Sequence, residues 1–232
     1  MRKLLQNVAG FFAANTELTE DIKKENIMSD KLVITIERQY GSGGRDVGHA
    51  LAELLGCKCY DQDLIFMAAQ RSGISEEALA EADEQASSSL LYTLAMGASM
   101  IFTNTTPMAV PINDALFIAQ SEIIRELSEK EDCIIVGRCA DYILSEHQKK
   151  IKVFVQRDMK DRITRIMERA GISESEAKDR IAKKDKKRAN YYNYYTGGKW
   201  GKPENYDLVV STSNVGIEGA ARIIYEYAKT AF

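Results

Sequence analysis

Residues 31–55 read KLVITIERQYGSGGRDVGHALAELL, a stretch that predicts a strand, a turn and a helix in succession. A β-branched apolar run at residues 32–36 predicts a buried strand, and residues 41–44, three of them glycine, predict a tight turn. Apolar residues between 47 and 55 then recur at helical spacing, and Gly56 offers a stop for the helix. This order of strand, turn and helix brings several backbone N–H groups to the positive end of a helix dipole, where a phosphate can bind.

The turn departs from both standard phosphate-binding patterns. Against GxxxxGK[ST], residues 38–45 read RQYGSGGR, in which Gly43 matches, Gly44 stands at the lysine position and Arg45 at the hydroxyl position. The dinucleotide pattern GxGxxG fails at Asp46, where the third glycine should stand. An ordinary glycine-rich connection between strand and helix is therefore an alternative. Arg45 favours a phosphate site, because a guanidinium at a helix N-terminus is unfavourable unless an anion balances it.

Length and composition indicate a soluble globular protein. The 232 residues suffice for one α/β domain with insertions, or for two small domains. A formal net charge of −3 argues against a protein that coats nucleic acid, and no apolar run has the length of a membrane span, so we expect neither partner. The four cysteines do not form CxxC pairs, and reduced buried thiols in a cytoplasmic protein are expected.

Residues 1–30 form an N-terminal extension that precedes the strand, turn and helix predicted at 31–55. Their basic start and short apolar stretch resemble a signal peptide weakly, but Gln6 and Asn7 interrupt the apolar part. An amphipathic helical extension is expected instead. An alternative is that translation starts at Met28, directly before the first strand.

Charged side chains follow two predicted strands. Asp61 and Asp63 come after a strand at residues 58–60, and Arg138 follows a strand at 132–136. Carboxyl ends of parallel strands form the ligand-binding edge of an open α/β sheet, so these residues are expected to face the same cleft as the glycine turn. The carboxylates suit Mg²⁺ or a substrate hydroxyl, although aspartate here also caps the following helix. The arginine suits a phosphate, or else pairs with a nearby acid at the surface.

Residues 157–202 form a basic segment in a net negative protein. The segment holds fourteen Lys and Arg against seven Asp and Glu. Ser173 and Glu176 have the spacing of a capping box, and six basic residues within 180–188 surround Asp185. Such a charge run often marks a solvated helix face. Beside a phosphate site it better suits a segment that closes over a polyphosphate.

Aromatic residues follow the basic run, where residues 191–200 read YYNYYTGGKW. Interleaved basic and aromatic side chains can stack single-stranded nucleic acid, but no RNA-binding motif accompanies them. Docking against the rest of the protein, or a dimer contact, is the ordinary use. Two further strands are predicted at 152–156 and 206–210, followed by a helix from about Gly216 that Thr212 or Ser213 caps.

Five motifs in consistent order resemble the cytidylate kinase-like family, a branch of the P-loop nucleoside monophosphate kinases. They are ITIERQYGSGGRDVG, YDQDLI, IIVGRCADYIL, DKKRANYYNYYTGGKWG and YDLVVST. The resemblance implies an α/β fold of the P-loop NTPase type, a three-layer sandwich with a parallel sheet core. It further implies one domain at 31–232, with a helical monophosphate-binding insert at about 64–115 and a helical lid at about 157–202.

The resemblance also implies an activity, namely transfer of the γ-phosphoryl group of ATP to a nucleoside monophosphate, CMP or dCMP, with Mg²⁺. A small-molecule nucleotide is then the partner, and the choice between monomer and homodimer stays open.

The implied site falls into four groups of residues. The donor nucleotide is expected on Tyr40, Gly41, Ser42, Gly43, Gly44, Arg45 and Asp46. The catalytic residues are expected to be Arg45, Arg138, Asp185 and Arg188. The substrate is expected on Asp61, Asp63, Arg138, Arg180 and Lys184. The metal is expected on Asp46 and Asp61.

Two positions depart from the family pattern. Where cytidylate kinases have an arginine for the acceptor phosphate, this chain has Met67, with Arg71 one turn further on. Cys139 stands where an aspartate follows the Gly-Arg pair. A kinase of another small acceptor is therefore one alternative, and the missing P-loop lysine leaves a nucleotide-binding regulator without turnover as the other.

Overall fold

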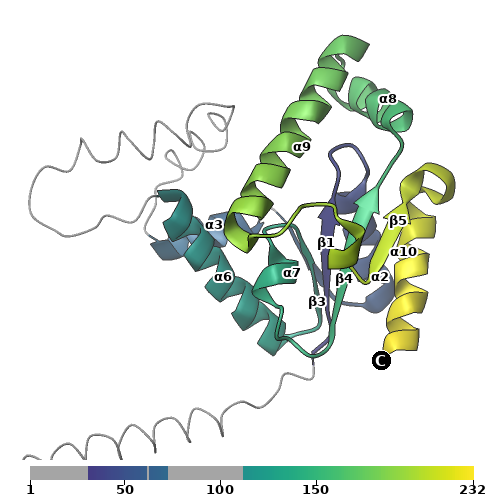
Figure 1. Cartoon of the computed structure of the whole chain (residues 1–232). Helices are drawn as coiled ribbons and strands as arrows, with labels where there is room; N and C mark the ends of the chain where they lie inside the picture. Colours follow the sequence, from purple (N-terminus) through teal and green to yellow (C-terminus); the bar gives the residue numbers. More distant parts are fainter. Residues whose placement is uncertain (1–30, 62, 73–111) are drawn as a thin grey trace, which may run out of the picture.

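The structure, a computed structural model, describes residues 31–61, 63–72 and 112–232, which are drawn in colour in Figure 1. The expected extension at 1–30 and residues 73–111 of the expected insert lie outside the described residues. None of the helices in the described ranges is long and apolar enough to cross a membrane.

A five-stranded parallel sheet forms the centre of the molecule. Its strands are β1 (Val33–Arg38), β2 (Lys58–Tyr60), β3 (Cys133–Val136), β4 (Lys150–Gln156) and β5 (Leu208–Ser211). The strand order is β2-β3-β1-β4-β5, and all neighbours pair in parallel. The predicted strands are confirmed, with ends shifted by one or two residues. Because all five strands run the same way, their carboxyl ends share one edge.

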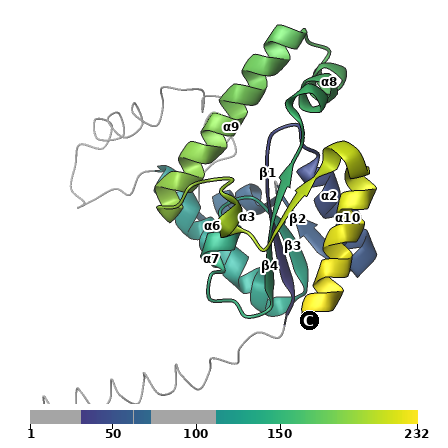
Figure 2. The ribbon, with the colours of Figure 1, turned by 45° about the vertical axis from the view of Figure 1, so that its right-hand side comes forward.

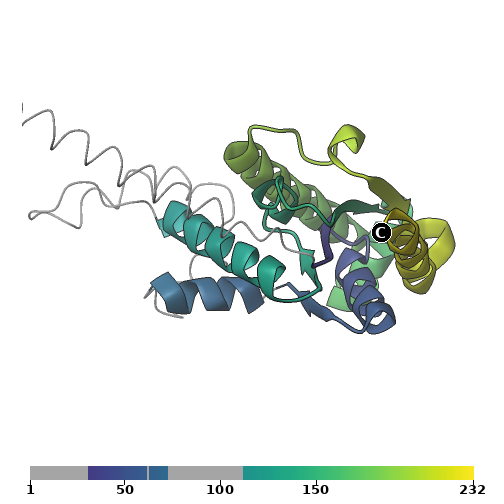
Figure 3. The ribbon, with the colours of Figure 1, turned by 90° about the horizontal axis from the view of Figure 1, so that it is seen from below.

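Helices cover both faces of this sheet, as Figures 1 and 3 show. The helices are α2 (Gly44–Leu55), α3 (Asp63–Ser72), α6 (Ile112–Lys130), α7 (Ala140–Ile143), α8 (Met159–Ala170), α9 (Glu174–Thr196), the 3₁₀ turn η1 (Pro203–Asn205) and α10 (Thr212–Ala231). Helices α2 and α10 cover one face, where Val47 and Leu51 pack against Ile34 and Ile36. Helices α3, α6 and α7 cover the other. The expected α/β three-layer sandwich with a parallel sheet core is confirmed.

Helices α8 and α9 rise above the carboxyl edge of the sheet, at the top of Figures 1 and 2. They share a small core of their own, made of Ile163, Ile166, Ala177 and Ile181. Tyr40, from the loop after β1, packs against this core. The predicted capping box at the start of α9 is confirmed, with Ser173 and Glu176 bonded reciprocally.

The predicted cap of the last helix is wrong. Helix α10 begins at Thr212 directly after β5, its N-cap is Ser211, and it breaks helical geometry at Gly216 (φ 67°, ψ −172°). The capping hydroxyl is that of Ser211, which accepts from the N–H of Ser213, while the hydroxyl of Thr212 donates to the carbonyl oxygen of Ser42, 2.6 Å away. The C-terminal helix is thereby joined to the glycine turn.

Candidate active site

The glycine turn has the backbone conformation that its glycines permit. Gly41 (φ 82°) and Gly43 (φ 83°) are left-handed, and Gly43 is the N-cap of α2. Ser42 is fully buried; its hydroxyl donates to the carbonyl of Gln39 at 2.9 Å and accepts from the N–H of Gly44 at 3.3 Å. The buried hydroxyl of Ser42 therefore links the two ends of the turn.

Several N–H groups of the turn are available to an anion. Within the described part of the chain, no hydrogen-bond acceptor is present for the N–H groups of Gly41, Gly43, Arg45 and Asp46. They surround the first turn of α2, where the helix dipole favours negative charge. N–H groups arranged in this way can bind the oxygens of a phosphate group.

Helix α8 packs directly on this loop. A Cβ placed on Gly41 would lie 3.3 Å from the Cβ of Arg162. Arg162, with 3% of its surface exposed, donates from Nε to the carbonyl of Tyr40 at 2.8 Å and pairs with Asp185 of α9. Asp185 also accepts from the N–H of Tyr40 at 2.7 Å. The expected catalytic residue Asp185 therefore links both helices of the basic segment to the loop.

Asp46, in the first turn of α2, is held by two arginines of α8. Arg165 pairs with its Oδ2 atom, and Arg169 lies 3.1 Å from the same oxygen. Burial first, and then the neighbouring charge of Arg169, lower the pKa of Arg165. The excess of positive charge predicted for residues 157–202 is thus placed beside the loop.

A second charged group lies at the ends of β1 and β2. Asp61 is nearly buried, and its carboxylate lies 2.9 Å from Nε of Arg45 and 3.4 Å from Nη2 of Arg38. Arg188 of α9 donates from Nη1 to the carbonyl of Arg38 at 2.8 Å, and its guanidinium lies 5.7 Å from the ring centre of Tyr40. Burial, and then the charge of Arg38, lower the pKa of Arg188 to about 10.

The turn after β3 completes this edge. Gly137, Arg138 and Cys139 all have positive φ (79°, 60° and 55°), which is uncommon for the two residues that are not glycine. Gly137 donates its N–H to the carbonyl of Ile36 in β1 at 3.0 Å. The backbone at Arg138 therefore lies beside the end of β1 and its Arg38.

Two buried carboxylates lie behind these cations. Glu37 accepts from Nε1 of Trp200 at 3.0 Å, and Asp141 accepts from the hydroxyl of Tyr192 at 2.8 Å. Among the residues that the structure describes, none forms a hydrogen bond with the other oxygen of Asp141. Burial, and then the charge of Glu37, raise the pKa of Asp141 to about 6. The aromatic residues of segment 191–200 thus dock the basic segment on the core.

The model of the cytidylate kinase-like family matches residues 33–214, which include the loop, the edge of the sheet and both basic helices. The chain belongs to the cytidylate kinase-like family. The solved structure of an uncharacterized protein from Eubacterium ventriosum ATCC 27560 is 29% identical to this family member, with a TM-score of 0.63 over 86% of this chain and 99% of that chain. The shikimate kinase of Bacteroides thetaiotaomicron is 14% identical, with a TM-score of 0.50 over 85% and 98% of the two chains, and shows the fold alone. No curated protein matches the chain.

Some expected site residues of this cytidylate kinase-like chain lie apart from the loop contacts. Arg180 and Lys184 are exposed on α9, and Asp63 is the exposed first residue of α3. Met67 is exposed on α3, and Arg71 makes a bidentate pair with Glu126 of α6, at 2.7 and 2.9 Å. In this arrangement neither Met67 nor Arg71 supplies the acceptor arginine of the family pattern.

The polar groups at this edge of the sheet suit the phosphates of a nucleotide and offer few ligands to a metal ion. Free N–H groups and guanidinium groups suit phosphate oxygens. Asp46 and Asp61 are each paired with two arginines, and the described residues contain no cluster of three metal-ligating side chains. Mg²⁺ needs only one or two carboxylates when phosphates and water supply its other ligands. Asp46 or Asp61 would fill that limited role.

Arg38 was not predicted as a site residue from the sequence, and no specific partner was predicted for Arg162 or Arg165. Arg38 stands at the carboxyl end of a buried strand, with Asp61 at the end of another, and opposite charges at one sheet edge are the signal for it. The contacts of Arg162 and Arg165 depend on how α8 folds back, which their spacing does not reveal.

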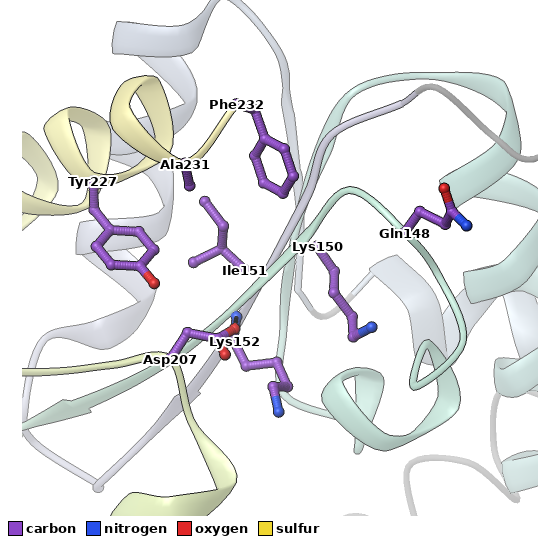
Figure 4. Close-up of a pocket in the computed structure, with 8 residues that line it drawn as sticks. All are labelled: Gln148, Lys150, Ile151, Lys152, Asp207, Tyr227, Ala231 and Phe232. Carbon is purple, nitrogen blue, oxygen red and sulfur yellow. Dashed lines mark hydrogen bonds between the residues drawn. The ribbon is translucent and has the colours of Figure 1, made fainter.

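A separate hollow of about 340 Å³ lies at the amino ends of β4 and β5 (Figure 4). It is lined by Gln148, Lys150, Ile151, Lys152, Asp207, Tyr227, Ala231 and Phe232. The carboxylate of Asp207, which lines this hollow, already accepts a hydrogen bond from the N–H of Lys152 at 2.8 Å. This hollow is at the opposite edge of the sheet from the loop.

Proposed function

We propose that the chain transfers the γ-phosphoryl group of ATP to a nucleoside monophosphate, with CMP or dCMP as the acceptor, in the presence of Mg²⁺. The observation that carries the proposal is the convergence at one edge of the sheet of free N–H groups from residues 41–46 and guanidinium groups from β1, α2, α8 and α9. Membership of the cytidylate kinase-like family supports it.

Phosphoryl transfer of this kind asks little covalent chemistry of the protein. It requires that donor and acceptor be held in line, that negative charge be spread over fixed cations and N–H groups, and that water be excluded. The N–H groups of residues 41–46 and Arg45 would hold the donor phosphates. Arg188 and Arg138 would stabilise the charge of the group in transfer.

Other residues keep these groups in place. Asp185 would fix the position of the Tyr40 backbone and of Arg162, since it bonds to both. Bound Mg²⁺ would offset charge on the donor phosphates, with Asp46 or Asp61 as its protein ligand. Asp61 and Asp63, with Arg180 and Lys184, would contact the acceptor once it is bound.

The setting we propose is the cytoplasm, where ATP is present and thiols stay reduced. All four cysteines are free thiols in the structure. Burial raises the pKa of Cys57 to about 11 and that of Cys59 to about 12, so neither is an activated nucleophile.

A kinase of another small acceptor is the second candidate. The exposed Met67 and the Arg71–Glu126 pair favour it, because the acceptor arginine of the family pattern is not reproduced. The third candidate is a nucleotide-binding regulator, for which the glycine at the lysine position, Gly44, is the argument.

An acceptor panel tests these candidates. Purified protein is incubated with Mg²⁺ and ATP together with each nucleoside monophosphate or with small hydroxylated acceptors, and ADP release is measured. We expect the highest rate with CMP or dCMP and a strong loss in Arg45→Ala. A higher rate with a different acceptor would favour the second candidate, and ATP binding without turnover on any acceptor would favour the regulator.

A further inference from the structure

Arg38 and Gly44 both depart from the P-loop pattern, and the side chain at position 38 requires the glycine at position 44. Arg38 stands where the pattern has its first glycine, and Gly44 stands where it has lysine. A Cβ placed on Gly44 would lie 2.5 Å from Cβ and 3.0 Å from Cγ of Arg38. Gly44 does not have the positive φ of its neighbour Gly43, so space explains this glycine. An arginine at position 38 and a lysine at position 44 therefore exclude one another.

The guanidinium of Arg38 extends from β1 across the end of β3. A Cβ placed on Gly137 would overlap Nη1 of Arg38, so a second glycine also leaves room for this side chain. Beyond Gly137 the guanidinium reaches Asp61, at 3.4 Å, while Glu37 lies 4.0 Å away. The side chain is 17% exposed. Arg38 therefore lies at the carboxyl edge of the sheet, paired with Asp61 and still partly exposed to solvent.

The positive charge around Arg38 is incompletely balanced. Asp61 is shared with Arg45, and Glu37 also accepts from the indole of Trp200. Arg188 lies close enough that the charge of Arg38, after burial, lowers its pKa. An anion between these guanidinium groups would relieve their repulsion.

We propose that Arg38 is a phosphate-binding residue whose guanidinium takes the place of the P-loop lysine at the β- and γ-phosphates of the donor nucleotide. A lysine at position 44 would extend from the first turn of α2, whereas Arg38 reaches the same edge from the end of β1. The planar guanidinium offers two parallel donors to phosphate oxygens. The proposal rests on the proposed function, because it takes a nucleoside triphosphate as the donor.

The test exchanges the two positions in the full-length protein. The variants are Arg38→Gly, Gly44→Lys and the double variant Arg38→Gly/Gly44→Lys. The matched control is Arg38→Ala/Gly44→Lys, which keeps a Cβ at position 38 and hence the overlap. The Kd for ATP with Mg²⁺ is measured by calorimetry, and the melting temperature of each variant reports folding.

We expect Arg38→Gly to weaken ATP binding about 10- to 100-fold, because a charge-assisted contact is lost. Gly44→Lys alone should weaken it as well, since the lysine displaces Arg38. The double variant should return to within about threefold of wild type, because a lysine then reaches the phosphates, and the control should not.

Wild-type affinity in Arg38→Gly, or a folded double variant that binds no better than either single variant, would overturn the proposal. If the Gly44→Lys variants do not fold, Arg38→Lys replaces them. It should bind ATP more tightly than Arg38→Gly, and equal affinities would overturn the proposal. These outcomes concern ATP affinity, whereas a wild-type protein that binds ATP and transfers nothing would contradict the proposed function alone.

Discussion

Arg188 donates a hydrogen bond of 2.8 Å to the carbonyl oxygen of Arg38, a residue 150 positions earlier in the chain. This bond joins α9 to the end of β1, directly before the glycine loop. Because Arg188 is largely withdrawn from solvent, α9 brings its positive charge to the loop and not to the surface.

Arg188→Ala should lower kcat about 100-fold or more, because the phosphoryl group in transfer loses a fixed cation that stabilises its charge. The Kd for ATP should change much less if the contact strengthens during transfer. Lys186→Ala, which removes an exposed cation from the same helix, is the control and should keep the wild-type kcat. A wild-type kcat in Arg188→Ala would contradict the role given to this residue.

Asp141→Asn should change the pH dependence of stability. The pKa of Asp141 is raised to about 6 by burial and by Glu37, above the unfolded value of about 3.9. The folded state therefore binds the proton of Asp141 more tightly than the unfolded state does. The stability that this protonated carboxyl contributes is fully present below about pH 4 and is lost as the pH rises through about 6. Asparagine is always neutral and still accepts from Tyr192.

The variant should therefore match wild type near about pH 4 and exceed its free energy of unfolding by about 3 kcal/mol at about pH 8. Urea unfolding at both pH values measures this difference. Asp179→Asn, at an exposed position on α9, is the control and should give no such trend. A pH-independent difference in Asp141→Asn would show that burial of this carboxyl does not favour its protonated form.

Thr212→Val should destabilise the protein by about 1–2 kcal/mol, because the carbonyl of Ser42 loses the buried hydroxyl that donates to it. The shape of the side chain is nearly kept, so packing is not the cause. We expect a weaker affinity for ATP as well, since α10 no longer fixes the loop. Thr212→Ser keeps the donor and should lie close to wild type in both calorimetric Tm and Kd.

Gly41→Ala tests the packing of α8 on the loop. Alanine at this left-handed position costs about 1–2 kcal/mol, and its Cβ would press on Arg162 and Ile166, each at 3.3 Å. Gly171→Ala has a similar φ of 63° with nothing within 4 Å of the added atom, so it carries the backbone cost alone. Gly41→Ala should therefore have the lower Tm, and equal melting temperatures would mean that α8 does not press on the loop.

The sequence predicted the fold well because its signals are local. The β-branched run of β1, the glycines at 41–44 and the Ser173–Glu176 box each act within a few residues, and all three appear as expected. The cap of α10 was the exception. Ser211 ends β5 and starts the helix with no linker, and Thr212 turns to Ser42 in a contact that local sequence does not encode.

The site was predicted in part, for a physical reason. Charged residues at strand ends and around the loop could be placed at one edge, because parallel strands share that edge. Arg38 could not be assigned, since the space it occupies is made by Gly44 and by the distant Gly137. The partners of Asp46 likewise come from α8, whose approach to the loop is a tertiary feature.

We propose that this edge of the sheet transfers a phosphoryl group from ATP to a pyrimidine nucleoside monophosphate. Transfer is followed by incubating the purified protein with Mg²⁺, ATP labelled in its γ-phosphate, and CMP or dCMP, and then separating the nucleotides. We expect the label to appear in CDP or dCDP and the amount to fall strongly in Arg188→Ala. Label that stays in ATP, or that passes only to water, would contradict it.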